Sequence, residues 1–355
     1  MMRRTRTLHA HLEPVFPAQA GTQRIDPVFP AQAGTQRLFR QISLRHRPDS
    51  RRSRADRSRS WRAGLGHLVL WLALVTISAT ARAEIRVTDD GGQSVVLQQP
   101  ARRIISMAPH VTELLYAAGA GERIVGTTRY SDYPAAALNI PRIGDSFAVD
   151  SERVLQLKPD LIVVWLHGNS DAQLEQLKRL GLPVFSSEPR RLSDIASTIR
   201  RFGLLTGNER VADDAARNFE SHVATLRSTY AGRAPVTVFY QVAERPLLTI
   251  NREHIIDDVL KLCGARNVFA GLSALTPSIS AEAVVARDPE AIVTSGDEPG
   301  HATGFAGWAK LTTLRATRHH NFILLTSDTI SRQSPRIVEG ARMLCEEIEK
   351  VRRKR

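Results

Sequence analysis

Two aromatic side chains stand where a parallel α/β fold would present them to a ligand. Tyr130 opens the segment Tyr130-Ser-Asp-Tyr-Pro134 just after an apolar run, and Trp165 ends the apolar run Leu161–Trp165. Open parallel sheets bind ligands beyond the carboxyl ends of their strands, and an aromatic face with a phenolic hydroxyl suits a flat macrocycle. A loop-anchoring Tyr130 and a core Trp165 are the alternatives, and the residues alone leave both open.

Motifs of catalysis and of metal binding are missing from the sequence. There is no Gly-x-Ser-x-Gly elbow, no Walker loop and no glycine fingerprint after a strand. His319 and His320 are adjacent, so their side chains should face apart, and no Cys-x-x-Cys pair supports zinc. We therefore expect no catalytic site, no metal and no cofactor. An α/β enzyme is the alternative from a different class.

The chain pattern predicts an α/β fold. Short apolar runs alternate with amphipathic segments, which is typical of βα units around parallel sheets. The expected strands are 103–107, 124–127, 161–165, 183–185, 236–242, 291–295 and 321–326. The turn Asp89-Asp90-Gly91-Gly92 predicts a hairpin before them. Residues 208–230 have apolar residues at helical spacing and neither Pro nor Gly, which predicts one helix roughly 35 Å long.

An internal repeat predicts two similar lobes. Residues 151–164 can be laid over residues 281–294, so that Glu152 meets Glu282 and Pro159 meets Pro289. Each copy predicts a short helix, a proline turn and a buried strand. We expect two Rossmann-like lobes joined by a single long helix, with a ligand cleft between the lobes. The boundaries are 84–207 for the first lobe, 208–231 for the helix and 232–350 for the second lobe.

The net charge of +13 is concentrated at the N-terminus. Residues 1–83 hold 15 of the 49 Lys and Arg residues and four of the 36 acidic residues, which leaves 34 basic and 32 acidic residues beyond. Because residues 84–355 are nearly neutral, they lack the basic surface of a nucleic-acid-binding protein, which excludes a nucleic-acid partner for them. Residues 1–58 contain an exact repeat, 14–24 and 27–37, and an arginine-rich run. We interpret them as disordered or as the translation of a start codon placed too far upstream. A basic arm that binds nucleic acid or lipid is the functional alternative.

Residues 59–83 have the order of a secretory signal. Arg59 and Arg62 precede the apolar stretch 65–77, and Ala81-Arg82-Ala83 is a small-residue cleavage site. The stretch is shorter than the ~20 residues that span a bilayer, so we expect a cleavable signal peptide. No cysteine lies near the cleavage point, which excludes a lipid anchor. These features predict export to a Gram-negative periplasm.

The two cysteines support that compartment. Cys263 and Cys345 are the only cysteines, and both lie in the second half of the chain. An even count in an oxidising compartment favours one disulfide. Two buried thiols are the alternative.

Five segments together resemble the helical-backbone, or class III, family of periplasmic binding proteins. The segments are Arg103–Gly119, Tyr130–Pro134, Gly144–Phe147, Leu157–Trp165, and Thr326-Ser-Asp328 followed by Ser334-Pro-Arg336. They are closer to the branch of this family that serves corrinoid importers than to the siderophore branch. The resemblance implies a monomeric, non-enzymatic protein that delivers a transported corrinoid to the permease subunits of an ABC importer.

The resemblance also implies the ligand contacts. It places Tyr130, Trp165 and Phe147 against the macrocycle. It also implies that a second-lobe segment contacts the ligand, made of Asp328, Thr329, Ile330, Ser331 and Arg332. The chain departs from the corrinoid branch at Ser146, Leu248 and Thr276, where that branch has aromatic residues. Haem or a ferric siderophore therefore remains the alternative ligand.

One glutamate in each lobe is a candidate for transporter docking. Members of the family dock through one surface glutamate per lobe, and the resemblance puts these at Glu152 and Glu282. The alternative is a purely local role, since an acidic residue in the first turn of a helix interacts favourably with the helix dipole.

Overall fold

The computed structural model describes residues 84–145, 148–296 and 303–355. The predictions for residues 1–58 and for the signal segment 59–83 lie outside these ranges. Every described residue belongs to one compact unit, Ala79–Arg355. Within the described ranges, no helix combines the length and the apolar character needed to cross a bilayer.

A hairpin opens the described chain, as predicted. Strands β1 (Ile85–Thr88) and β2 (Ser94–Leu97) pair antiparallel around a turn in which Gly92 has a φ of +78°. The carboxylate of Asp89 accepts hydrogen bonds from the backbone N–H groups of Gln93, at 2.7 Å, and Ser186, at 3.0 Å. One side chain thus closes the turn and fastens the hairpin to the first sheet.

The first lobe is built on a four-stranded parallel sheet in the order β4-β3-β5-β6. Its strands are β3 (Ile104–Ser106), β4 (Ile124–Thr127), β5 (Leu161–Trp165) and β6 (Val184–Ser187). Its helices are α2 (Pro109–Ala117), α3 (Ser151–Gln156), α4 (Asp171–Lys178) and α5 (Leu192–Thr206), with 3₁₀ turns η1 (Gly121–Arg123) and η2 (Ala135–Asn139). Ile104 and Val163 pack on the α2 and α5 side, whereas Ile105 and Ile162 pack on the α3 and α4 side. Strands buried on both faces explain the continuous apolar runs of the sequence.

The second lobe repeats this plan with the sheet order β10-β7-β11-β12, also parallel. Its strands are β7 (Val236–Gln241), β10 (Ala265–Asn267), β11 (Ala291–Gly296) and β12 (Phe322–Thr326), with a small hairpin of β8 (Ala243–Glu244) and β9 (Leu247–Leu248). Its helices are α7 (Ile255–Leu262), α8 (Ala281–Arg287), α9 (Arg315–Arg318), α10 (Ser327–Ile330) and α11 (Ile337–Arg353), with 3₁₀ turns η3 (Thr303–Phe305) and η4 (Trp308–Lys310).

In chain order, both sheets therefore have the strand order second, first, third, fourth. The repeated segments occupy equivalent places, because α3 precedes β5 as α8 precedes β11. The α/β fold of two similar lobes is confirmed.

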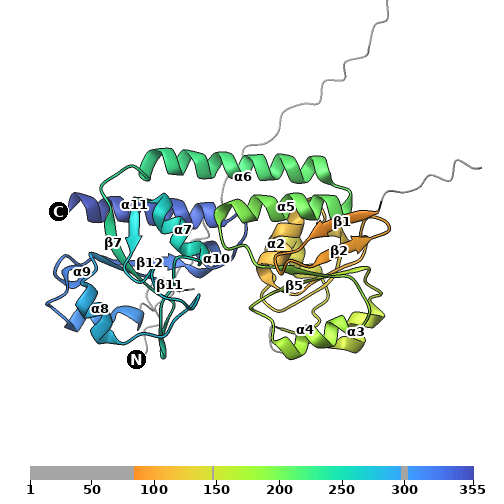
Figure 1. Ribbon diagram of the computed structural model, residues 1–355, viewed down its shortest axis with the longest axis horizontal. Helices are drawn as coiled ribbons and strands as arrows, with labels where there is room; N and C mark the ends of the chain where they lie inside the picture. The colour runs from red at the N-terminus through yellow and green to blue at the C-terminus, as the bar shows by residue number, and fades with distance from the viewer. Residues whose placement is uncertain (1–83, 146–147, 297–302) are drawn as a thin grey trace, which may run out of the picture. The chain divides into compact units, whose positions relative to one another are not determined.

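Helix α6 (Glu209–Tyr230) follows the first lobe and leads into β7, close to the predicted limits. Figure 1 shows it running alongside α5 and α11. It buries Ala212, Ala216 and Phe219 in an apolar core that also contains side chains of both sheets. A helix packed along its length resists bending, so we expect it to restrict how far the lobes move apart.

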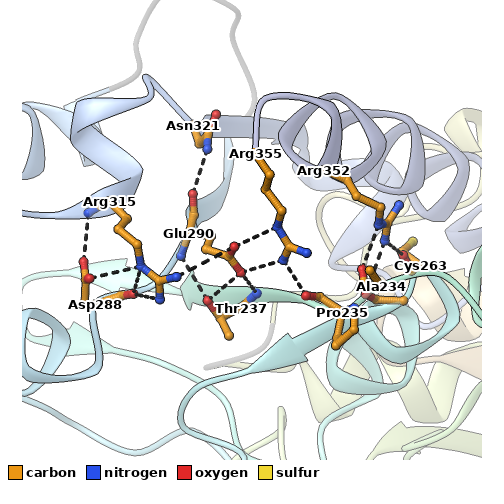
Figure 2. Close-up of polar contacts among 11 residues, drawn as sticks. Ala234, Pro235, Thr237, Cys263, Asp288, Glu290, Arg315, Asn321, Arg352 and Arg355 are labelled. Carbon is orange, nitrogen blue, oxygen red and sulfur yellow. Dashed lines mark hydrogen bonds and ion pairs between the residues drawn. The ribbon is translucent and has the colours of Figure 1, made fainter.

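The C-terminal helix is fastened to the second lobe at several points. Cys263 and Cys345 form the predicted disulfide between the end of α7 and α11. Figure 2 shows Arg352 donating hydrogen bonds to the backbone oxygens of Ala234 and Cys263. Arg355 forms ion pairs with Glu290, which precedes β11.

Candidate ligand-binding site

The carboxyl ends of the two sheets define where a ligand would bind. In both lobes the chain order reverses between the first and third strands, which are β3 and β5 in one lobe and β7 and β11 in the other. Such a switch point leaves a crevice because the following loops diverge to opposite faces of the sheet. Trp165 is the last residue of β5, and His110 lies in the first turn of α2 after β3.

Trp165 is held by its neighbours at this switch point. Its ring meets the ring of His110 edge to face, with the centroids 5.3 Å apart. A methyl group at Gly168 would lie only 1.9 Å from the indole, so the glycine is needed for this close approach. Trp165 remains partly exposed. It therefore has both a fixed position and an accessible edge.

Two ring nitrogen atoms are buried at this place. Among the described residues, neither Trp165 Nε1 nor His110 Nε2 has a hydrogen-bond partner. Burial, with a smaller contribution from the positive charge of Arg332, lowers the pKa of His110 to about 3. The imidazole is consequently neutral at physiological pH.

Tyr130 occupies a strained position at the surface. It follows β4 with a φ of +66°, and its side chain is 68% exposed. A positive φ is uncommon for a bulky residue and is found at ligand-binding sites. Backbone hydrogen bonds from Arg129 to Gly144, at 2.9 Å, and from Ser131 to Thr128, at 3.4 Å, flank it. The aromatic face is available to a ligand.

The second-lobe segment is a helical turn followed by Ser331 and Arg332. Helix α10 contains Asp328, Thr329 and Ile330. Ile330 is completely buried in the apolar core, so in this structure its side chain presents no surface to a ligand. Thr329 Oγ1 donates to the Thr326 carbonyl at 3.1 Å, and the hydroxyls of Ser331 and Ser295 lie 3.2 Å apart.

Arg332 is engaged by three carboxylates. Its Nη1 lies 3.0 Å from Glu113 and 2.7 Å from Asp132, and its Nη2 lies 2.6 Å from Asp328. The pKa of Arg332 is raised because these carboxylates outweigh the effect of its burial. Glu113 and Asp132 belong to the first lobe, so the arginine links the two halves. Neither acidic partner was predicted from the sequence, although a glutamate between the apolar residues Val111 and Leu114 is a signal of a buried, paired carboxylate.

The other positions singled out in the sequence add no aromatic ring to the described part of the site. Phe147 and Ser146 lie outside the described residues. Leu248 is partly buried in β9, and Thr276 is exposed. The second lobe therefore has no aromatic ring at these two positions.

Glu152 and Glu282 occupy equivalent positions in the first turns of α3 and α8. Both are exposed, and within the described chain neither has an ion-pair partner. The side chains of Asp150 and Ser280 cap the two helices. Hydrogen bonds from the Glu282 backbone and from the Ser280 hydroxyl lower the pKa of Glu282. Both glutamates are therefore charged residues on the surface at the start of a capped helix.

The described residues contain no group of three or more His, Cys, Asp or Glu side chains arranged to hold a metal ion. The groups gathered at the carboxyl ends of the strands are aromatic rings, an imidazole, hydroxyls, and a guanidinium paired with carboxylates. These are groups that contact and orient an organic ligand.

Comparisons with known proteins agree with this architecture. The sequence profile described as periplasmic binding protein matches residues 104–329. A vitamin B12-binding protein of Vibrio cholerae is 36% identical over 246 residues, which cover 69% of this chain and 88% of the relative. One from Yersinia pestis is 37% identical over 250 residues, covering 70% and 87%.

Solved structures of periplasmic binding proteins are also similar to this chain. The periplasmic vitamin B12 binding protein BtuF of Vibrio cholerae is 35% identical and has a TM-score of 0.66, covering 71% of this chain and 98% of its own. The periplasmic haem-binding protein HutB of Vibrio cholerae, at 20% identity and a TM-score of 0.60, covers 69% and 98% and shares the fold. From the matched length, the identities and the repeated parallel sheets, we conclude that the chain belongs to the class III family of periplasmic binding proteins.

Proposed function

We propose that this protein captures a corrinoid of the vitamin B12 type in the periplasm and delivers it to an inner-membrane ABC importer. The observation that carries the proposal is the 36% identity, over 88% of its length, to a relative named as a vitamin B12-binding protein. The chain binds and releases this ligand unchanged, without a cofactor.

The proposed ligand contacts come from both lobes. Tyr130 and Trp165 offer aromatic surface to the flat macrocycle, and Phe147 is a further proposed contact from the segment outside the described residues. Asp328, Thr329, Ser331 and Arg332 offer hydrogen-bonding groups, which suit the peripheral amides of a corrin. Arg332 has five N–H donors, so it retains free ones while it is paired with three carboxylates.

Delivery depends in this proposal on Glu152 and Glu282. The two exposed carboxylates belong to equivalent helices of two similar lobes, and such a pair suits a transporter with two related permease subunits. Export by the cleavable signal at residues 59–83 would bring the protein to the periplasm, where it acts as a monomer made of the lobes 84–207 and 232–350 and the helix 208–231.

Titration of the purified protein with cyanocobalamin, haem and a ferric siderophore tests the ligand class. Cyanocobalamin should bind most tightly and should co-elute unchanged in gel filtration. Tighter binding of haem or of the siderophore would assign a different ligand. Chemical conversion of cyanocobalamin would instead indicate an enzyme.

A further inference from the structure

Glu113 joins the first half of the chain to the second. It lies in α2 and is only 4% exposed, yet its carboxylate accepts four hydrogen bonds from residues that precede α11. Arg336 donates two of them, at 3.0 and 2.6 Å, Ser334 donates one at 2.6 Å, and Arg332 donates one at 3.0 Å. A buried carboxylate depends on such pairing, because removing its partners leaves an uncompensated charge.

The same two arginines also contact the loop that carries Tyr130. Arg332 forms a hydrogen bond of 2.7 Å with Asp132. The guanidinium carbon of Arg336 lies 4.0 Å from the centre of the Tyr133 ring, within the range of a cation–π contact. Asp132 and Tyr133 are the second and third residues after Tyr130. The second half of the chain thus holds this loop at two neighbouring points.

We propose that Glu113, Asp132, Tyr133, Arg332 and Arg336 form an interlobe bracket that sets the position of the Tyr130 loop. Arg336 is a positioning residue in this arrangement, since it binds the buried Glu113 and stacks on Tyr133. The effect on ligand binding rests on the proposed function, whereas the effect on the loop does not.

The conformation of the Tyr130 loop explains why it depends on the contacts of the bracket. Tyr130 has a positive φ, and the backbone hydrogen bond from Ser131 to Thr128 is long at 3.4 Å. A residue held in a strained conformation persists only where its surroundings determine that conformation. A cavity of about 300 Å³ adjoins the bracket and is lined in part by Glu113, Tyr133 and Arg336. Tyr133 therefore has room to move once its contacts are lost.

Hydrogen–deuterium exchange of the ligand-free protein tests the bracket directly. In Arg336→Gln and in Asp132→Asn, the amides of Arg129 and Ser131, which donate to the carbonyls of Gly144 and Thr128, should exchange about tenfold faster than in the wild type, the scale of a coupling of 1.4 kcal/mol. Asp132 is about half exposed and its loss removes a single contact, so Asp132→Asn keeps the test valid if Arg336→Gln fails to fold.

Arg315→Gln is the matched control. Arg315 pairs with Asp288 at 3.0 Å, and both residues lie in the second half of the chain. This variant loses the same charge but should leave exchange at the Arg129 and Ser131 amides unchanged. Wild-type exchange at these amides in folded Asp132→Asn would overturn the bracket, as would equal acceleration in Arg315→Gln.

Cyanocobalamin titration of the same variants tests the consequence for binding. Arg336→Gln should raise the Kd about five- to tenfold, and Tyr133→Phe, which keeps the ring, should bind like the wild type. Faster loop exchange with an unchanged Kd would overturn the positioning role of Arg336. A wild type that binds no cyanocobalamin, together with variants that still accelerate loop exchange, would overturn the proposed function and leave the bracket in place.

Discussion

The rings of His110 and Trp165 meet edge to face at a centroid distance of 5.3 Å, at the carboxyl ends of β3 and β5. Among the described residues, neither His110 Nε2 nor Trp165 Nε1 has a hydrogen-bond partner. Buried polar atoms without partners cost free energy, so each needs an explanation. The two packed rings thus place two such nitrogen atoms beside the expected ligand-binding edge.

Trp165→Ala and Tyr130→Ala should each weaken corrinoid binding by roughly 1–3 kcal/mol, the scale of losing an aromatic contact. Their effects on the unfolding free energy should differ. Trp165 is partly buried, so its loss should cost about 2–3 kcal/mol, whereas the exposed Tyr130 should cost little. Calorimetric titration and chemical denaturation measure the two effects.

Trp165→Phe and Tyr130→Phe serve as controls that keep an aromatic face. Both should retain more affinity than the alanine variants. If the alanine variants bound cyanocobalamin like the wild type while Trp165→Ala lost stability, Trp165 would be a packing residue only.

His110 should make the unfolding free energy fall as the pH is lowered. Its pKa is lowered from 6.5 to about 3 in the folded protein, mainly by burial. Between these values the unfolded state binds more protons, so acid favours unfolding. A decrease from pH 7 to pH 5 should therefore remove about 2 kcal/mol. His254, whose pKa burial lowers to about 4, acts in the same direction.

The variant His110→Gln separates the two histidines. Denaturation at pH 7 and pH 5 should show a smaller difference for this variant than for the wild type, whatever its absolute stability. An identical pH dependence in both proteins would show that the folded pKa of His110 is close to its ordinary value.

Glu290 should be a stabilising residue of the second lobe. Its carboxylate accepts hydrogen bonds from the Thr237 backbone at 2.8 Å, the Thr237 hydroxyl at 3.0 Å and Arg355 at 2.9 Å (Figure 2). These partners hold the pKa of Glu290 below its usual value, although burial opposes them. Glu290→Ala should lower the unfolding free energy by about 2–3 kcal/mol, because the Thr237 N–H loses its acceptor.

Glu347→Ala is the comparison for this measurement. Glu347 forms a surface ion pair with Lys350 one turn along α11, and such pairs contribute under about 1 kcal/mol. Equal losses in Glu290→Ala and Glu347→Ala would contradict the role given to Glu290.

The main elements of the fold could be predicted because their signals are local. The strand β5 is a continuous apolar run buried on both faces, and α6 has a long helical period without Pro or Gly. Strand β10 was missed since it has only three residues and its central Arg266 is exposed. Helix α10 was not predicted because its four residues are too few to show a helical spacing of apolar residues.

The candidate site was only partly predictable for a different reason. The positions of Tyr130 and Trp165 could be predicted because each lies at or just after the end of an apolar run that predicts a strand. Glu113 and Arg332 meet across 219 positions of the chain. Charge types are visible in a sequence, but their pairing depends on how the two lobes pack together in the folded chain.

The double variant Glu152→Arg with Glu282→Arg should abolish corrinoid uptake in cells. The purified variant should keep a ligand Kd within a factor of about three of the wild type, under 1 kcal/mol, because both residues lie on the surface in the first turns of α3 and α8. Charge reversal would replace attraction to cationic permease residues by repulsion, which affects encounter and orientation.

Glu175→Arg with Glu347→Arg is the matched control, since it changes the net charge equally at two other helical surface positions, Glu175 exposed and Glu347 partly exposed. It should leave uptake near the wild-type level. Uptake and affinity together separate docking from binding, because a ligand-site defect would lower both. Normal uptake by a stably expressed Glu152→Arg, Glu282→Arg protein would rule out docking through these residues. Their role would then be confined to the favourable interaction of an acidic residue with the first turn of its helix.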